Sequence, residues 1–274
     1  MGIEALRYDG KRALVVGGAT GMGAATAAIV RDLGAEVVVM DHAEVTLDGV
    51  KSIKLDLRDK AGIDRAVEEC GGPVHALFSC AGVADGTPGI EKINFIGHRH
   101  LIDRLLEGDM LPRGSAIGMI SSAAGLGWEA NLAQVQEFLA ITDFDDAVAW
   151  IEKNQKADYM FSKQAINGYV AAQAFPLLKR GIRINAILPG PTNTPLAQAN
   201  AEMWLGFGAD YREQTGVEAS TPDEQGYALA FLCSDAASVV NGITMITDSG
   251  YVASGITGSF PDAKPAVDFL FGRY

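Results

Sequence analysis

The chain has few cysteines, no long apolar run and no signal-like start. Its three cysteines, Cys70, Cys80 and Cys233, are scattered and form no CxxC pair. This pattern indicates neither a disulfide framework nor a zinc site, so we expect no metal. No apolar run reaches the roughly 18 residues of a membrane span, and the first ten residues lack the basic start and apolar core of a signal peptide. We therefore expect a cytoplasmic protein with no membrane partner.

Basic residues are also scarce. The chain has 22 lysines and arginines against 34 acidic residues, a formal net charge of −12. Nucleic-acid binding requires a basic surface, so we expect no nucleic-acid partner. Apolar residues make up 48% of the 274 residues, which is ample for one core. Without a linker, a composition break or an internal repeat, we predict a single domain over residues 1–274.

What the chain does have begins with a strand–turn–helix–strand unit. Residues 12–17 form a β-branched apolar run, followed by the turn Gly17-Gly-Ala-Thr-Gly21-Met-Gly23, an alanine-rich helix over 24–33, and a strand over 36–40 that ends at Asp41. Such glycines let backbone N–H groups approach a pyrophosphate at the helix N-terminus, and the acid falls where the ribose hydroxyls would sit. The unit indicates a dinucleotide site. A plain tight turn and a solvated strand-end acid remain the alternatives.

The alternation of strands and helices continues along the chain. Further strands are predicted over residues 52–55, 74–78, 115–120, 182–187 and 243–246. Repeated βα units imply a Rossmann-like, doubly wound α/β fold: a mostly seven-stranded parallel sheet with helices on both faces. Ligands bind such sheets beyond the carboxyl ends of the strands. The residues at those ends are Gly17, Asp41, Asp56, Gly82, Ser122 and Pro189.

Tyr159 and Lys163 are four residues apart in a stretch, 158–180, that reads as a helix. Positions i and i+4 share a helix face, so a phenol and an ammonium would lie side by side. A nearby cation favours the phenolate and can lower the tyrosine pKa of roughly 10 by ~1–3 units. A phenol tuned in this way can exchange a proton with an alcohol or a carbonyl. The alternative is a surface tyrosine beside a surface lysine.

An unusual segment, residues 128–156, separates Ser122 from Tyr159. Two short amphipathic helices are predicted there, the second starting near Thr142 and Asp145. Their apolar stripes are Leu132, Val135 and Leu139, then Phe144, Ala147, Val148 and Ile151. The stripes could pack on the chain's own surface, form a subunit contact, or act as a lid over substrate. We expect a homodimer or homotetramer.

These elements together resemble the classical short-chain dehydrogenases/reductases, over residues 11–251. The family's glycine turn matches residues 16–23, with Val16 in place of threonine, and its Asn-Asn-Ala-Gly loop matches 79–82, where only Ala81 and Gly82 agree. Asn94, Ser122, Tyr159 and Lys163 match the catalytic positions. The Pro-Gly motif matches Pro189 and Gly190, with Thr192 and Thr194 downstream.

The resemblance implies a mechanism. Tyr159 would act as acid or base on the substrate oxygen, and Lys163 would lower its pKa and hydrogen-bond the nicotinamide ribose. Ser122 would orient the substrate, Asn94 would hold a water linking Lys163 to solvent, and Ser121 would be structural. The implied cofactor-binding residues are Gly17, Thr20, Gly21, Met22, Gly23, Asp41, Asp56, Leu57, Ala81, Gly82, Tyr159, Lys163, Pro189, Gly190, Thr192 and Thr194.

NAD is the expected cofactor. Asp41 can accept two hydrogen bonds from the adenosine ribose and would repel a 2′-phosphate. Gly18, His42 and Ala43 flank the site, and no arginine or lysine is expected to stand ready to bind that phosphate. Asp56 is expected at the adenine amino group, with Leu57 beside it. A strand-terminal turn residue is the alternative for Asp56.

Within the family, the glycine turn, Asp41 and the 128–156 insertion resemble the bacterial 3-alpha-hydroxysteroid dehydrogenases/carbonyl reductases, whose insertion builds their dimer contact. The expected substrate loop, 195–221, carries aromatic and methionine side chains that suit a flat apolar ring. The function predicted is therefore NAD-dependent interconversion of a secondary alcohol and a ketone on a hydrophobic cyclic substrate. An aryl or sugar-derived alcohol, and an NAD-binding regulator without turnover, are the alternatives. The apolar tail, 261–274, is expected to dock on an apolar surface, and a neighbouring subunit's surface near its active site is one candidate.

Overall fold

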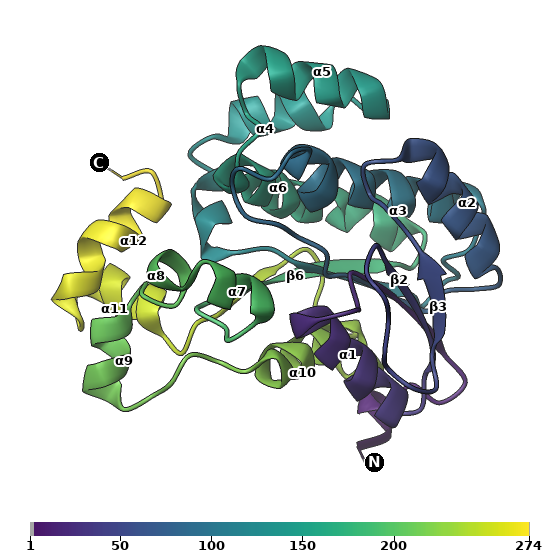
Figure 1. The fold of residues 1–274 in the computed structure, drawn as a ribbon, viewed down its shortest axis with the longest axis horizontal. Coiled ribbons are helices and arrows are strands. Elements are labelled where there is room, and N and C mark those ends of the chain that lie inside the picture. The colour runs from purple at the N-terminus through teal and green to yellow at the C-terminus, as the bar shows by residue number, and fades with distance from the viewer. Residues whose placement is uncertain (1–2, 274) are drawn as a thin grey trace.

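The computed structural model describes residues 3–273. Its seven strands form one sheet in the order β3-β2-β1-β4-β5-β6-β7, and every neighbouring pair is parallel. The predicted doubly wound α/β fold is confirmed (Figure 1). The strands are β1 (Arg12–Val16), β2 (Glu36–Asp41), β3 (Lys51–Lys54), β4 (Ala76–Ser79), β5 (Ala116–Ile120), β6 (Arg183–Pro189) and β7 (Thr244–Thr247).

Helices cover both faces of the sheet because its strands are apolar on both sides. Leu14 and Val16 of β1 belong to the core under α2, α3 and α6, whereas Ala13 and Val15 belong to the core under α1 and α10. Figure 1 shows these two helical layers on opposite sides of the sheet. Their bounds are α1 (Gly21–Asp32), α2 (Lys60–Cys70), α3 (Gly97–Glu107), α6 (Tyr159–Lys179) and α10 (Pro222–Cys233).

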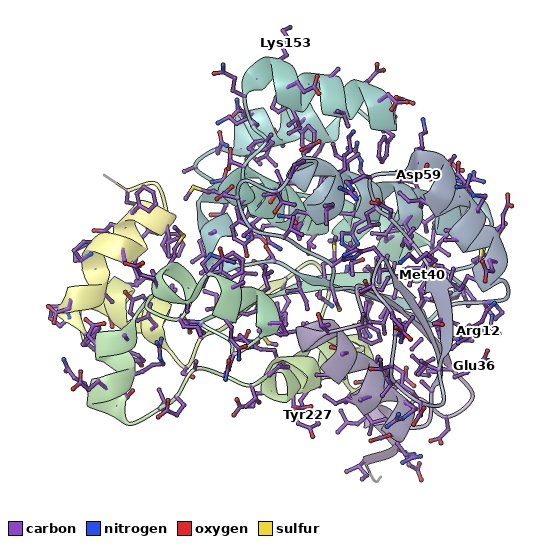
Figure 2. The ribbon with its side chains drawn as sticks, in the orientation of Figure 1. Arg12, Glu36, Met40, Asp59, Lys153 and Tyr227 are labelled. Carbon is purple, nitrogen blue, oxygen red and sulfur yellow. The ribbon has the colours of Figure 1, made fainter. Side chains whose placement is uncertain are left out.

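The two ends of the parallel strands differ in their surroundings. At the opposite ends of β1 and β2, Arg12 donates to Glu36 at 2.7 Å, and the pair lies near the edge of the molecule (Figure 2). At the carboxyl ends, Met40 is buried beside Val16.

No helix within residues 3–273 is both long and apolar enough to cross a membrane.

The insertion forms the two predicted helices, α4 (Leu132–Leu139) and α5 (Phe144–Asn154). Its apolar stripes pack on the chain's own core, the first of the three interpretations. The buried side chains are Val135, Phe138, Phe144, Ala147, Trp150 and Ile151, all in the core shared with α3 and α6. Lys153, on the outer face of α5, points away from the body of the molecule (Figure 2).

Three details of the insertion differ from prediction. The N-cap of helix α5 is Asp143 rather than Thr142, and the Asp143 carboxylate accepts from the N–H groups of Asp145 and Asp146. Phe138 and Trp150 complete the stripes, with ring centroids 5.1 Å apart. Leu132 remains 39% exposed. The buried stripes are therefore not free to form a subunit contact or a lid.

Candidate active site

Helix α6 holds Tyr159 and Lys163 side by side, as their spacing predicts. The helix starts at Tyr159 because the Asp158 carboxylate caps it, accepting from Phe161 N at 2.7 Å. Lys163 is 3% exposed, and its Nζ lies 5.3 Å from the centroid of the Tyr159 ring. This amine donates to Ile120 O, at the end of β5, at 3.1 Å. The pair is thereby fixed at the carboxyl edge of the sheet.

The pKa of Tyr159 moves opposite to the expected direction. Burial raises it to about 12, while a hydrogen bond with Ser122 lowers it and the Asp85 carboxylate raises it further. Burial also lowers the pKa of Lys163 to about 8. Desolvation favours the neutral form of each group, and for Tyr159 it outweighs the lowering of the pKa by the hydrogen bond with Ser122. At neutral pH the site holds a phenol that can donate a proton beside a cationic amine.

Ser122 brings a second hydroxyl to Tyr159. It caps a short 3-10 helix, η3 (Ala123–Trp128), where its Oγ accepts from Ala124 N at 3.2 Å. The hydrogen bond between Ser122 and Tyr159 means that the two hydroxyls converge. Ser121 instead donates to Lys163 O at 3.3 Å, the structural role expected for it. The two adjacent serines thus bond different groups: Ser122 the Tyr159 side chain, and Ser121 the backbone of α6.

Asn94 lies in a π-helical turn, η2 (Lys92–Ile96), that leads directly into α3. π turns often occur at functional sites. The buried Asn94 side chain accepts from Val83 N at 2.8 Å and donates to Val83 O at 3.1 Å and Ser162 Oγ at 3.2 Å. It therefore ties the loop after β4 to α6, and a water-holding role for Asn94 remains a proposal.

His98, one turn after Asn94, is a site residue that the sequence analysis missed. Its Nε2 bonds Ala81 O at 3.0 Å, and a carbonyl can only accept, so Nε2 carries the proton. Burial lowers the pKa of His98 to about 4, which keeps the ring neutral. Asn94 and His98 together hold the backbone of residues 81–83. The i, i+4 spacing of Asn94 and His98, which places both on one helix face, could have identified His98 from the sequence.

The glycine turn fits a dinucleotide. A Cβ at Gly17 would lie 2.3 Å from Ala81 N, and one at Gly23 would lie 1.9 Å from Gly17 O. Only glycine at these two positions lets the backbone segments of the turn approach each other this closely. Helix α1 begins at Gly21, and the Thr20 side chain makes no capping bond. The first N–H groups of α1 are free to bind a phosphate, which the helix dipole also favours.

The predicted nucleotide residues meet in one pocket of about 290 Å³. Strands β1, β2 and β4 and helix α1 contribute to it because the carboxyl ends of parallel strands share one edge. The predicted residues that line it are Gly17, Thr20, Gly21, Met22, Gly23, Asp41, Asp56, Leu57, Ala81, Gly82 and Thr194.

The two acids of this pocket have different partners. Asp41 accepts from Ala19 N at 2.9 Å and from Ala43 N at 2.8 Å, which ties it to the glycine turn. Asp56 bonds the Arg58 guanidinium at 2.8 Å, and this hydrogen bond lowers the pKa of Asp56.

Two basic residues lie near this pocket, and each is bonded to another group of the chain. Arg58 lines the pocket. Lys54 pairs in register with Asp41 across β3 and β2, and its amine donates to His42 O. Only the sheet register brings Lys54 to this rim.

A second pocket, of about 410 Å³, adjoins the first and contains the Tyr159, Ser122 and Lys163 side chains. Met22, Cys80, Gly82, Thr194 and Leu196 line both pockets. The predicted residues Pro189, Gly190 and Thr192 line only the second. Its remaining wall is largely apolar, with Met203, Trp204, Phe207, Phe269 and Leu270.

The predicted substrate loop consists of three short helices, α7 (Pro195–Ala199), α8 (Ala201–Trp204) and α9 (Ala209–Thr215). Thr194 caps α7 by accepting from Ala197 N at 3.1 Å. On α8, the Trp204 ring packs on the Tyr159 ring at 5.3 Å. The loop therefore covers the tyrosine directly.

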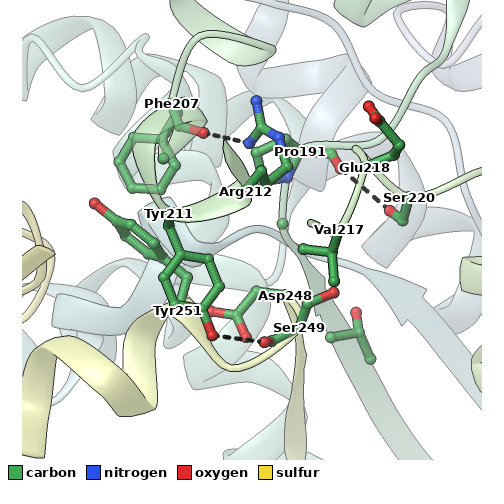
Figure 3. Close-up of a pocket in the computed structure, with 13 residues that line it drawn as sticks. Pro191, Phe207, Tyr211, Arg212, Val217, Glu218, Ser220, Asp248, Ser249 and Tyr251 are labelled. Atoms are coloured by element: carbon green, nitrogen blue, oxygen red, sulfur yellow. Dashed lines mark hydrogen bonds between the residues drawn. The ribbon is translucent and has the colours of Figure 1, made fainter. Parts of the chain in front are cut away.

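Helix α9 is held against the C-terminal segment. Tyr211 donates to Ser249 O at 3.0 Å, and Tyr211 and Phe207 both pack on Tyr251, at 5.6 and 5.0 Å (Figure 3). The cavity beside these rings has about 20 Å³, room for roughly one water. The contacts among these rings anchor the loop, and the cavity beside them is too small for a second ligand.

The apolar tail docks on its own chain. Val267 of α12 (Lys264–Leu270) packs with Tyr251 and Phe260, the first of which begins α11 (Tyr251–Thr257). Phe269 and Leu270 line the 410 Å³ pocket of their own chain, whereas the candidate position in the sequence analysis was on a neighbouring subunit. Tyr274 lies outside the described residues.

Comparisons with known proteins agree with this geometry. A family model described as "Enoyl-(Acyl carrier protein) reductase" matches residues 17–252. Coniferyl-alcohol dehydrogenase of Pseudomonas sp. (strain HR199 / DSM 7063) is 28% identical over 264 residues, which cover 91% of this chain and 99% of the relative. Cis-4-hydroxycyclohexanecarboxylate dehydrogenase of Sinomonas cyclohexanicum is 29% identical over 260 residues, covering 88% and 96%.

Among solved structures, the 3-alpha-hydroxysteroid dehydrogenase from Pseudomonas sp. B-0831, complexed with NADH, is similar with a TM-score of 0.73 and 27% identity. The match covers 91% of this chain and 99% of that one. With the glycine turn, the Tyr159–Lys163 pair and the sheet order in place, this protein belongs to the classical short-chain dehydrogenases/reductases.

Proposed function

We propose that the protein is an NAD-dependent oxidoreductase that interconverts a secondary alcohol and a ketone by hydride transfer, acting as a single domain. The observation that carries the proposal is the meeting of Tyr159, Ser122 and Lys163 in an apolar pocket that adjoins the nucleotide pocket. The nicotinamide would supply the hydride acceptor in oxidation and the donor in reduction.

The chain's own residues would handle the proton and the geometry. In reduction, the Tyr159 hydroxyl gives its proton to the carbonyl oxygen, and in oxidation the alcohol proton returns to Tyr159. Ser122, bonded to Tyr159, donates to the same oxygen and orients the carbon. Such preorganised donors typically contribute ~2.7–4 kcal/mol of barrier lowering. The Lys163 ammonium favours the phenolate that forms when Tyr159 gives up its proton.

A hydrophobic cyclic substrate fits the pocket best. Trp204, Met203, Phe207 and Phe269 present flat or flexible apolar surfaces around Tyr159. Relatives are named for ring-bearing alcohols: a hydroxycyclohexanecarboxylate, a 3-alpha-hydroxysteroid and the aryl compound coniferyl alcohol. The last of these supports an aryl alcohol as the second candidate substrate class.

A panel of alcohols tests the function. The protein is incubated with NAD⁺ and cyclohexanols, steroid alcohols, aryl alcohols or sugar alcohols, and NADH is followed at 340 nm. We expect turnover of the cyclic secondary alcohols and little with the sugar alcohols. NADH binding without absorbance change on any alcohol would instead identify a regulator without turnover.

The preference for NAD is tested separately. Asp41 would repel a 2′-phosphate, while Arg58 is engaged by Asp56 and Lys54 by His42. We expect kcat/KM to be at least tenfold higher with NAD⁺ than with NADP⁺, about 1.4 kcal/mol. Asp41→Ala should narrow this ratio. Asp56→Ala, which frees Arg58, is the matched comparison, and equal use of both cofactors by the wild type would refute the role of Asp41.

A further inference from the structure

The 410 Å³ pocket contains one acid. Among the described residues that line it, only Asp85 and Lys163 carry charged side chains. Asp85 lies in the loop after β4, and its Oδ1 accepts from Tyr159 N at 2.6 Å. A carboxylate therefore stands at the wall of the proposed substrate site, next to the residue that would transfer the proton.

The position of this carboxylate is fixed. Two residues earlier, Asn94 bonds both the N–H and the C=O of Val83. On the other side, the bond to Tyr159 N holds Asp85 to the N-terminus of α6, where the helix dipole favours a negative charge. Gly86 follows in a left-handed conformation, with φ of 81°, and turns the chain away. The Asp85 side chain is thus bonded to α6 and the loop backbone two residues earlier to Asn94, while Asp85 itself stays exposed to solvent.

Among the described residues that line the pocket, no cation bonds the Asp85 carboxylate. The Lys163 amine is buried and directed to Ile120 O. Asp158, the cap of α6, adds a second carboxylate at the same helix end but does not line the pocket. A substrate with its own carboxylate would therefore meet repulsion and find no free ammonium or guanidinium. A hydroxyl or ammonium group could instead donate to Asp85.

We propose that Asp85 is a specificity-determining residue, which excludes carboxylate-bearing alcohols and favours substrates that present a neutral or cationic hydrogen-bond donor. The inference rests on the proposed function for the identity of the pocket. It goes beyond that function by assigning the charge of the substrate class.

Binding to the NADH-loaded protein tests this without turnover. The probes are cis-4-hydroxycyclohexanecarboxylate and the corresponding carboxamide, which share ring and hydroxyl and differ in charge. Calorimetry should give a Kd for the carboxamide about tenfold lower than for the carboxylate. Raising the salt concentration from 0.05 to 0.5 M shortens the Debye length from about 14 to about 4 Å, so the ratio of the two Kd values should fall toward one. Equal Kd values in the wild type would overturn the proposal.

Three variants assign the effect to a residue. Asp85→Asn keeps an oxygen that can accept from Tyr159 N and removes the charge, so the ratio should fall to about twofold. Asp85→Glu keeps the charge and should retain most of the discrimination. Asp158→Asn removes one charge from the same helix end and should leave the ratio near the wild-type value. Equal shifts in Asp85→Asn and Asp158→Asn would assign the discrimination to the general field and overturn the proposal.

The alcohol panel separates this inference from the proposed function. Discrimination in binding with no turnover of any alcohol would refute the oxidoreductase proposal and leave the role of Asp85 standing. Turnover of carboxylate and carboxamide with equal kcat/KM would refute only the role of Asp85. Failure of both probes to bind would refute the assignment of the pocket itself.

Discussion

At the scale of single residues, burial separates the acidities of Tyr159 and Lys163. The pKa of Tyr159 rises to about 12, whereas that of Lys163 falls to about 8. At neutral pH the tyrosine is a phenol and the lysine is a cation. In the proposed reaction this phenol would donate a proton to a carbonyl, and the adjacent ammonium would stabilise the charge that Tyr159 then acquires.

Replacing Tyr159 by phenylalanine should abolish turnover and preserve cofactor binding. The substitution removes the transferable proton but keeps the ring against Trp204. We expect kcat to fall by about 10²–10⁴-fold, the usual contribution of general acid–base catalysis. NADH fluorescence should report an unchanged Kd. Ser122→Ala should also lower kcat, and Ser121→Ala, the matched neighbour, should not. A phenylalanine variant with most of its kcat would refute the assigned role.

His98 should make the fold sensitive to acid. Its pKa is about 4 in the folded protein and about 6.5 when unfolded, so the unfolded chain binds more protons between these values. The free energy of unfolding should therefore fall as pH drops from about 6.5 to about 4, by up to roughly 3 kcal/mol. His98→Gln, which can still donate to Ala81 O, should weaken this dependence. Thermal melts at pH 7, 6 and 5 measure it, and identical slopes in both proteins would contradict the prediction.

At the scale of elements, the insertion acts as a cover for α3 and α6. Phe138 of α4 packs on Phe95, Trp150 and Phe161 with ring centroids 5.1–5.6 Å apart, and Phe144 of α5 packs on His100 at 5.7 Å. These contacts join the insertion to the π turn that carries Asn94 and to the helix that carries Tyr159. The insertion thus packs against the two elements that position Asn94 and Tyr159.

Phe144→Ala should lower fold stability and leave the assembly state unchanged. Removing a buried phenylalanine typically costs ~3–5 kcal/mol. Leu132→Ala, an exposed position in the same insertion, should cost less than about 1 kcal/mol. Urea unfolding gives the stabilities, and light scattering gives the mass. A shift toward monomer at unchanged stability would restore the subunit-contact interpretation of α5.

At the scale of the whole molecule, an apolar edge remains exposed. β7 ends the sheet, and Ile243 and Ile246 are exposed along it. Val239 is 94% exposed and Phe175 of α6 is 73% exposed. Asn241 donates to Ala174 O at 2.9 Å, which brings these segments together. An exposed edge strand can pair with another chain, and exposed apolar patches mark interaction sites, so we predict that this surface, and not the buried stripes of the insertion, forms the contact of the expected homo-oligomer.

Charges on this surface should break the proposed assembly. Phe175→Asp together with Val239→Asp should shift the mass seen by light scattering toward monomer, with little change in monomer stability because both side chains are exposed. Lys153→Asp, on the outer face of α5, is the control and should leave the mass unchanged. A wild-type protein that is monomeric at high micromolar concentration would contradict the proposal.

The sequence by itself determined the features that depend on local geometry. Apolar runs and glycine punctuation marked all seven strands to within about two residues, and i, i+4 spacing paired Tyr159 with Lys163. These patterns are readable because helix and strand periods follow from backbone dihedral angles.

Tertiary structure decided what depends on distant neighbours. Sheet register placed Lys54 beside Asp41, burial reversed the direction of the Tyr159 pKa shift, and loop packing brought Asp85 to the start of α6. The insertion's stripes likewise could not reveal which surface they cover until α3 and α6 were in place. Register, desolvation and packing are set by residues far apart in the chain, and a single sequence carries no periodicity that encodes them.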